Sequence, residues 1–128
     1  MHVVFDLDGV LLDSARDLDW LDRALESTLA AFDVPATEDN VERLFPASVP
    51  NFRNAAASFD VPVTDLWQTR DRCYVAEKTR AIESGEIGPF PDMNVISEIH
   101  DRYPLSIISN SPPVVIETFL ETTDYADA

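Results

Sequence analysis

The sequence predicts an α/β fold, and three observations support this prediction. Near its start, the chain of 128 residues has a short run of β-branched and aromatic residues, 2–7, that is typical of a buried strand. A long stretch with helical periodicity follows, and a second apolar run, 105–108, lies between two predicted helices. An order of strand, helix and strand favours a parallel sheet with a right-handed crossover.

Apolar spacing and capping residues define the expected helices. In the first helix, leucines recur at spacings of three and four and form one apolar stripe, which Ser14 precedes as N-cap and Pro35 ends. Thr37 is the expected N-cap of the second helix. We expect helices over residues 15–33, 37–45, 51–59, 64–84, 92–102 and from 112 onward.

Glycines and prolines divide the chain into two parts. Several of them gather between residues 85 and 91, where the long helical stretch ends. We therefore assign residues 1–15 and 88–128 to an α/β core of which only the first two strands are present. Residues 16–87 form an inserted, all-helical part.

The charge of the chain is strongly negative. It has 24 acidic and 9 basic residues, a net charge of −15, and Lys78 is its single lysine. Such a surface repels nucleic acid backbones and anionic membranes, so we expect neither as a partner. Heavy use of Asp with almost no Lys resembles the proteins of salt-loving archaea, whose solvated carboxylates keep a protein soluble when salt screens their repulsion. The composition therefore predicts a halophilic origin.

Other features of the sequence exclude whole classes of protein. No apolar run reaches the ~18 residues of a membrane helix. The single cysteine, Cys73, excludes an internal disulfide and a cysteine-based zinc site. The chain opens on an apolar strand and not on a signal peptide. We expect a soluble, cytoplasmic protein.

Two carboxylates stand where the first strand ends. Asp6 and Asp8 point to the same side of an extended backbone, and ligands of parallel α/β sheets bind beyond the carboxyl ends of strands. The pair repels itself unless a cation bridges it or one carboxyl is protonated, and its hard oxygens suit magnesium. One carboxylate can attack as nucleophile while the other moves a proton. Two solvated turn aspartates are the alternative interpretation.

The same segment resembles a known motif. Residues 6–14, DLDGVLLDS, are similar to the first motif of the haloacid dehalogenase (HAD) superfamily, and residues 105–112, LSIISNSP, resemble its second motif. The run 88–92 resembles the segment that leads from a helical cap back into the core. The resemblance covers the whole chain and implies a HAD-type Rossmann-like core with an inserted helical cap.

The resemblance implies a role for each matching residue. Asp6 corresponds to the nucleophile that takes the phosphoryl group, and Asp8 to the acid/base that protonates the leaving oxygen and then activates water. Magnesium would be held by the Asp6 side chain and the backbone carbonyl of Asp8. Ser109 corresponds to the hydroxyl that hydrogen-bonds the phosphoryl oxygen. Asn110 is a neighbour that touches phosphate or substrate, and the Leu7 amide adds a phosphate contact.

These roles imply an enzyme that acts on phosphate esters. An acid at the position of Asp8 favours phosphate ester hydrolysis or phosphoryl transfer over dehalogenation, where no leaving oxygen needs a proton. The implied function is a magnesium-dependent phosphatase that acts on a small phosphorylated metabolite. A phosphomutase that uses the same aspartates is a second enzyme interpretation.

The sequence departs from the family pattern after the second motif. The Lys of the third motif and the acidic pair of the fourth lie downstream, and this chain ends at Ala128 before either. Lys78 lies in the expected cap and does not match. We therefore expect a C-terminally incomplete protein that has little activity alone and self-associates through the open edge of its second strand. A non-catalytic binding or interaction protein on a degenerate core is the alternative from another class.

Overall fold

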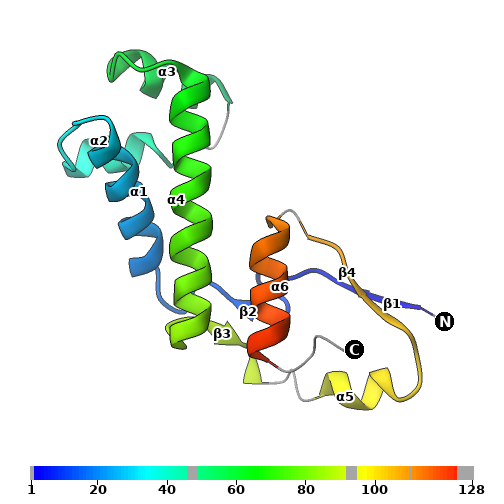
Figure 1. The fold of residues 1–128 in the computed structure, drawn as a ribbon. Helices are drawn as coiled ribbons and strands as arrows, with labels where there is room; N and C mark the ends of the chain where they lie inside the picture. Colours follow the sequence, from blue (N-terminus) through cyan, green and yellow to red (C-terminus); the bar gives the residue numbers. More distant parts are fainter. Residues whose placement is uncertain (1, 46–48, 92–94, 110, 124–128) are drawn as a thin grey trace. The chain divides into compact units, whose positions relative to one another are not determined.

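The computed structural model describes residues 2–45, 49–91, 95–109 and 111–123 (Figure 1). Its strands are β1 (Val3–Phe5), β2 (Leu12–Asp13), β3 (Gly88–Pro89) and β4 (Leu105–Ile107). Its helices are α1 (Asp19–Ala31), α2 (Glu38–Arg43), α3 (Val49–Ser58), α4 (Val63–Ser84), α5 (Val95–His100) and α6 (Pro113–Thr122). This confirms the expected α/β class. None of the described helices is long and apolar enough to cross a membrane.

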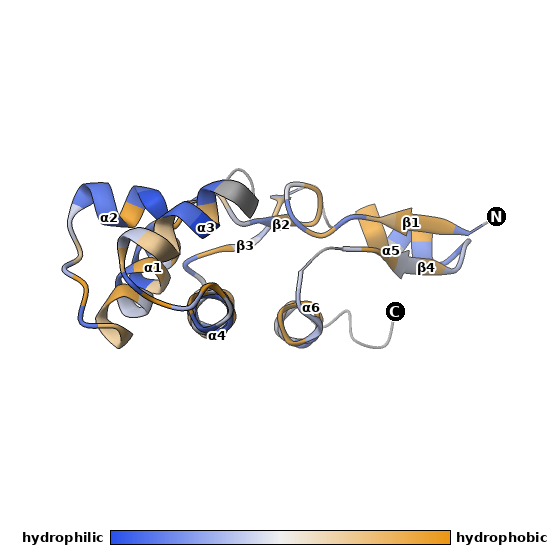
Figure 2. Cartoon of the chain, turned by 90° about the horizontal axis from the view of Figure 1, so that it is seen from above, coloured by the Kyte–Doolittle hydropathy of each residue, from blue (hydrophilic) through white to orange (hydrophobic). Residues whose placement is uncertain are grey.

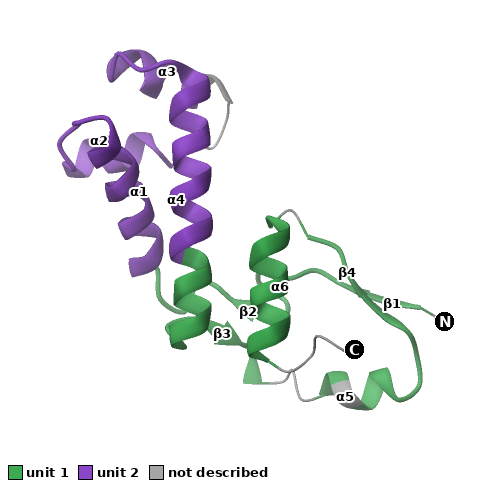
Figure 3. Ribbon diagram, viewed as in Figure 1, with its two compact units in different colours: residues 1–18, 78–128 green, residues 19–77 purple. Residues whose placement is uncertain are grey.

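The chain forms two compact units, which Figure 3 distinguishes by colour. Unit 1 contains residues 1–18 and 78–128, and all four described strands belong to it. Unit 2 contains residues 19–77, and its described secondary structure is entirely helical. The helix α4 contributes residues to both units. The structure is therefore an α/β core interrupted by a helical insertion, while the domain limits of 16 and 87 stay a prediction.

The two strands expected from the apolar runs pair with each other in parallel. Val3 lies opposite Leu105, and Phe5 lies opposite Ile107. The Ile108 N–H donates a hydrogen bond of 2.9 Å to the Phe5 carbonyl, which extends the pairing to the carboxyl ends of both strands. The first and second core strands thus end side by side at one edge of the sheet.

The faces of this small sheet are apolar and partly exposed. Figure 2 colours β1 and β4 largely as hydrophobic. Val4 is half exposed, and Ile108 just beyond β4 is 69% exposed. Self-association through this edge stays a prediction.

The chain also forms a second, antiparallel pairing that the sequence did not predict. Leu12 pairs with Pro89, and Asp13 pairs with Gly88. Each of these strands, β2 and β3, has only two residues. A segment of that length has no readable periodicity, because an alternating pattern needs about four residues. The pairing joins two segments of unit 1 that lie on either side of the helical insertion in the sequence.

This pairing corrects one expected helix boundary. The first helix was expected from residue 15 with Ser14 as its N-cap, but α1 begins at Asp19. Residues 12–13 are in a strand, so the chain has to turn before a helix can start. Thr37 is confirmed as the N-cap of α2, where its hydroxyl accepts a hydrogen bond of 3.3 Å from the Asn40 N–H. The start of the fifth expected helix at residue 92 lies outside the described residues.

Each unit has its own buried apolar side chains. Those of unit 2 come from α1, α3, α4 and the end of α2, and they form one cluster of Leu25, Leu29, Leu44, Phe52, Ala56 and Leu66. Edge-to-face ring pairs, Trp20 with Tyr74 and Phe52 with Trp67, add to unit 2, each with centroids 5.3 Å apart. The buried apolar side chains of unit 1 include Leu7, Leu12, Ile82, Ile87, Val115 and Phe119.

Leu44 and Phe45 form a matched pair for testing the core of unit 2. Leu44 is fully buried in the cluster, whereas the adjacent Phe45 is half exposed. We expect Leu44→Ala to lower the free energy of unfolding by about 2–5 kcal/mol, because it removes buried methyl groups and leaves a cavity. Phe45→Ala should change it by less than about 1 kcal/mol. Urea denaturation followed by circular dichroism measures both, and equal effects would contradict the assigned core.

Candidate functional site

A tight turn after β1 presents the two aspartates. The Leu7 carbonyl accepts hydrogen bonds from the N–H groups of Leu11 and Leu12, at 3.0 and 2.8 Å. Gly9 adopts a φ of +78°, a conformation that a residue with a Cβ adopts only with strain. The Leu7 side chain is fully buried, whereas the flanking Asp6 is exposed and Asp8 is partly exposed.

Asp8 lies at the centre of a polar cluster built from three segments of unit 1. The Lys78 ammonium, from α4, donates to Asp8 Oδ1 at 2.7 Å. The Ser111 hydroxyl, just before α6, donates to Asp8 Oδ2 at 2.5 Å. Lys78 Nζ also lies 3.5 Å from Ser111 Oγ. Both carboxylate oxygens of Asp8 are therefore engaged, each by a different element.

The electrostatics of this cluster favour the ionised form of Asp8. Burial raises the pKa of the Asp8 carboxyl. The hydrogen bonds of Lys78 and Ser111, the charge of Lys78 and a hydrogen bond with Ser14 lower it, and the resulting pKa lies below its ordinary value of 3.8. The contacts therefore stabilise the ionised form of Asp8, which is the form that accepts a proton.

The residues that the sequence singled out are brought to one edge of the sheet. Asp6 follows β1 directly, and Ser109 follows β4 by two residues, at the ends of strands that pair in parallel. The exposed Asp6 carboxylate accepts a hydrogen bond of 2.7 Å from the Leu7 N–H. The Leu7 amide therefore already has a partner in this structure, and its contact with phosphate stays a prediction. Asn110 lies outside the described residues.

Lys78 and Ser111 were not predicted as site residues. The sequence placed Lys78 in the helical insertion without a role, but its side chain is only 1% exposed and contacts Asp8. One signal could have identified it. Lys78 lies four residues after Tyr74 and four before Ile82, in the apolar register of its helix. A lysine in such a register requires a buried anion as its partner.

The donor set at the end of β1 fits a magnesium ion. Mg²⁺ binds one or two carboxylates and completes its octahedron with water and substrate phosphate oxygens. The exposed Asp6 carboxylate offers such a ligand. The Asp8 carboxylate is already held by Lys78 and Ser111, so Asp8 would contribute its backbone carbonyl. These two oxygens are the ones that the sequence motif implies.

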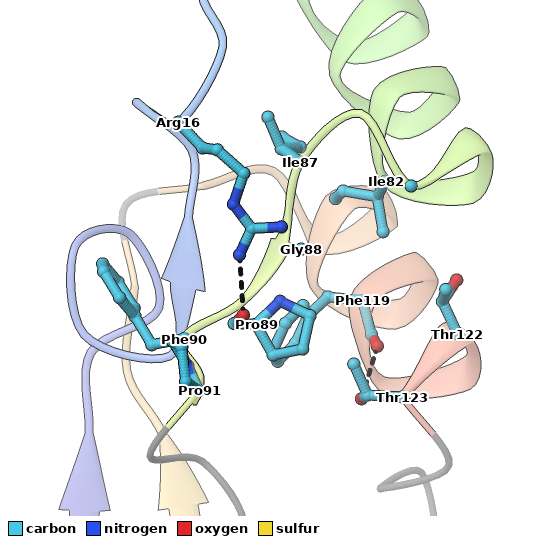
Figure 4. A pocket seen from close by; sticks show the side chains of 11 residues that line it. Arg16, Ile82, Ile87, Gly88, Pro89, Phe90, Pro91, Phe119, Thr122 and Thr123 are labelled. Carbon is cyan, nitrogen blue, oxygen red and sulfur yellow. Dashed lines mark hydrogen bonds between the residues drawn. The ribbon is translucent and has the colours of Figure 1, made fainter.

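Unit 1 also contains a cavity of about 550 Å³ (Figure 4). Its described lining comes from the end of α4, β3 with the residues after it, and α6. Arg16 reaches into this region and donates a hydrogen bond of 2.9 Å to the Pro89 carbonyl. Asp6, Asp8 and Lys78 are not among its described lining residues.

Comparisons with known proteins identify the fold. The sequence matches no protein-family model and no curated protein. A haloacid dehalogenase-like hydrolase from Streptococcus pneumoniae superposes with a TM-score of 0.61 at 20% identity, covering 98% of this chain and 57% of its own. A protein assigned as a beta-phosphoglucomutase from Thermotoga maritima gives 0.64 at 14% identity, with the same coverage. CbbY from Rhodobacter sphaeroides, solved in complex with phosphate, gives 0.57 at 18%, covering 94% of this chain and 56% of its own.

These similarities establish a haloacid dehalogenase-like fold for the chain. They cover nearly all of it, including the core strands and the helical insertion. The chain spans a little over half the length of the solved structures that it matches.

Breaking the Asp8–Lys78 pair should destabilise unit 1. Asp8→Asn removes the carboxylate that lies 2.7 Å from the buried Lys78 ammonium, and we expect it to lower the free energy of unfolding by about 1–3 kcal/mol. This is less than for a fully buried pair, because the Asp8 side chain is 36% exposed. The double variant Asp8→Asn/Lys78→Met should recover most of the loss, because it removes the buried ammonium together with the carboxylate.

Asp6→Asn serves as the matched control for that measurement. It changes an exposed carboxylate two residues away and should alter the free energy of unfolding by less than about 0.5 kcal/mol. Thermal and urea unfolding of the four proteins provide the comparison. A double variant that is no more stable than Asp8→Asn alone would contradict the pairing.

Proposed function

We propose that the protein is a phosphoric monoester hydrolase of the HAD type that acts on a small phosphorylated metabolite. One observation carries the proposal: Asp6 stands at the end of β1 beside an Asp8 carboxylate held by two donors, at the edge where β4 delivers Ser109. The fold is shared with hydrolases, and one similar structure contains phosphate. In this proposal, residues 16–87 are the cap and residues 1–15 with 88–128 belong to the core.

Two half-reactions follow from these residues. In the first half Asp8 acts in its protonated form: an Asp6 oxygen attacks the phosphorus, the bond between phosphorus and the ester oxygen breaks, and the leaving oxygen takes the Asp8 proton as the alcohol departs, which leaves Asp8 ionised. In the second half, Asp8 accepts a proton from a water molecule whose oxygen attacks the aspartyl phosphate. The acyl–phosphate bond breaks, and inorganic phosphate and the Asp6 carboxylate are regenerated. Mg²⁺ would be held by the Asp6 carboxylate and the Asp8 backbone carbonyl, and when bound it would neutralise phosphate charge.

Ser109 has the hydrogen-bonding capacity that its role requires. Its hydroxyl oxygen accepts a hydrogen bond of 3.0 Å from the Ser111 N–H. A hydroxyl that accepts in this way still has its own O–H to donate. In the proposal, Ser109 donates this hydrogen to a phosphoryl oxygen, and the bond from Ser111 orients the group.

A phosphomutase is the second candidate, because one similar structure is assigned as a beta-phosphoglucomutase. In that reaction the phosphoryl group on Asp6 passes to a second hydroxyl of the substrate and not to water. Phosphorus NMR distinguishes the two activities, because a mutase yields an isomeric phosphate ester and a phosphatase yields inorganic phosphate. We place the reaction in the cytoplasm, where phosphorylated metabolites occur and a protein without disulfides is stable.

Replacing the nucleophile tests the proposed reaction. We expect Asp6→Asn to lower the turnover of p-nitrophenyl phosphate with Mg²⁺ by several orders of magnitude, because an amide is a poor nucleophile and a weak magnesium ligand. Asp101→Asn, at an exposed position away from the strand ends, is the control and should retain full activity. Activity of Asp6→Asn within tenfold of the unaltered protein would remove Asp6 from the nucleophile role.

We also propose that the protein is adapted to high salt, as in halophilic archaea. The negative charge is shared by both units: unit 1 has 13 acidic and 4 basic residues, and unit 2 has 11 and 5. Repulsion within each unit therefore opposes folding at low ionic strength.

Salt should accordingly stabilise the fold. The melting temperature should rise as potassium chloride increases from about 0.05 M to molar concentrations, where the Debye length shortens to ~3 Å. Differential scanning calorimetry at fixed pH measures this change. A melting temperature that stays constant or falls over this range would exclude the adaptation to salt.

A further inference from the structure

The burial of Lys78 and its contact with Asp8 are not explained by packing alone. Lys78 is the single lysine of the sequence and is almost fully buried, with its ammonium 2.7 Å from Asp8 Oδ1. Ser111 holds the other oxygen of the same carboxylate. A buried lysine is costly even when paired, and an apolar residue of similar size commonly serves packing as well or better. The ammonium therefore calls for an explanation other than packing.

Two donors on opposite oxygens fix the plane of the Asp8 carboxyl group. The terminal torsion of an aspartate is broad and roughly two-fold, so a single hydrogen bond leaves the group free to rotate. Contacts on both oxygens remove that freedom. Each oxygen keeps a second lone-pair position, through which Asp8 can still give or take a proton in a defined direction.

One anchor stands on a packed helix and the other just before one, whereas Asp8 is in a turn. Lys78 precedes the buried Ala81 and Ile82 on α4. Ser111 stands just before α6, whose Val115 and Phe119 are fully buried. A functional side chain is held most accurately when its supporting groups come from rigid elements.

We infer that Lys78 is a positioning residue for proton transfer: together with Ser111, it fixes the direction in which Asp8 exchanges a proton with the substrate oxygen or with water. This inference rests on the proposed phosphatase function. It assigns Lys78 to the acid/base step, which matters most when the leaving oxygen is strongly basic.

The contact itself can be tested by NMR without any activity. In protein labelled with ¹⁵N-lysine, the single ε-ammonium gives one signal, which needs no assignment. We expect a slowly exchanging ammonium signal that shifts or disappears in Asp8→Asn and changes less in Ser111→Ala. Asp6→Asn should leave it unchanged. A Lys78 signal that is the same in Asp8→Asn as in the unaltered protein would overturn the inference.

Leaving-group dependence tests the function of the contact. Kinetics of the full chain with Mg²⁺ compare p-nitrophenyl phosphate, whose leaving group needs little proton donation, with glycerol phosphate, whose alkoxide needs it strongly. Lys78→Met should lose at least about tenfold more kcat on glycerol phosphate than on the aryl ester, within the range of general acid catalysis. Lys78→Arg should retain part of the kcat on glycerol phosphate that Lys78→Met loses. Arg72→Met, an exposed cation earlier on α4, should not produce it.

The remaining outcomes also decide the inference. Equal losses of kcat on both substrates would show a merely structural role and would overturn the inference. A further loss of kcat when Lys78→Met is added to Asp8→Asn would also overturn it. If Lys78→Met does not fold, Ser111→Ala removes the other anchor and should show the same selective loss. If the unaltered chain turns over neither ester, the NMR comparison replaces the kinetic one, and the Lys78 signal decides whether Asp8 is held as inferred.

Discussion

The parallel pairing of β1 with β4 is the constraint on which the site depends. It joins residues about a hundred positions apart, with Val3 opposite Leu105. Closing so long a loop costs conformational entropy, although this cost grows only slowly with loop length. The short pairing of β2 with β3 divides the loop, because it holds Leu12 and Asp13 against Pro89 and Gly88. The two strand ends that carry Asp6 and Ser109 can therefore meet, although the whole helical insertion lies between them in the sequence.

Two kinds of charge interaction in this chain differ in their sensitivity to salt. Its many surface carboxylates repel one another across water and are sensitive to ionic strength. The Asp8–Lys78 pair includes an ammonium that is shielded from solvent, and buried pairs are screened much less by salt. A high-salt medium can therefore relieve the surface repulsion while leaving the pair in the site intact. The single lysine of the chain, Lys78, thus has its charge at a position that is shielded from solvent and salt.

The sequence predicted those parts of the fold that local patterns encode. The apolar runs identified β1 and β4, the leucine spacing identified α1, and the placement of Asp6 and Asp8 after the first strand follows from strand geometry alone. It did not predict β2 and β3, because two-residue strands are defined by their partner and not by their own composition. The helix α1 was expected to start too early for the same reason: Ser14 is a typical N-cap residue, and only the presence of β2 just before it shows that the helix starts later. The contact of Lys78 with Asp8 spans 70 residues, and no local pattern encodes it.

The burial of the single lysine also changes how the protein can be handled chemically. Reagents that acylate ε-amines, such as common dyes, cross-linkers and coupling resins, meet no accessible lysine side chain on the folded chain. Conjugation at side chains can instead use carboxylates, which are abundant, or the partly buried thiol of Cys73. Acylation at Lys78 would instead mark those molecules in which the end of α4 has separated from the turn after β1. An ordinary amine-labelling reagent thereby becomes a probe of local opening at the carboxylate site.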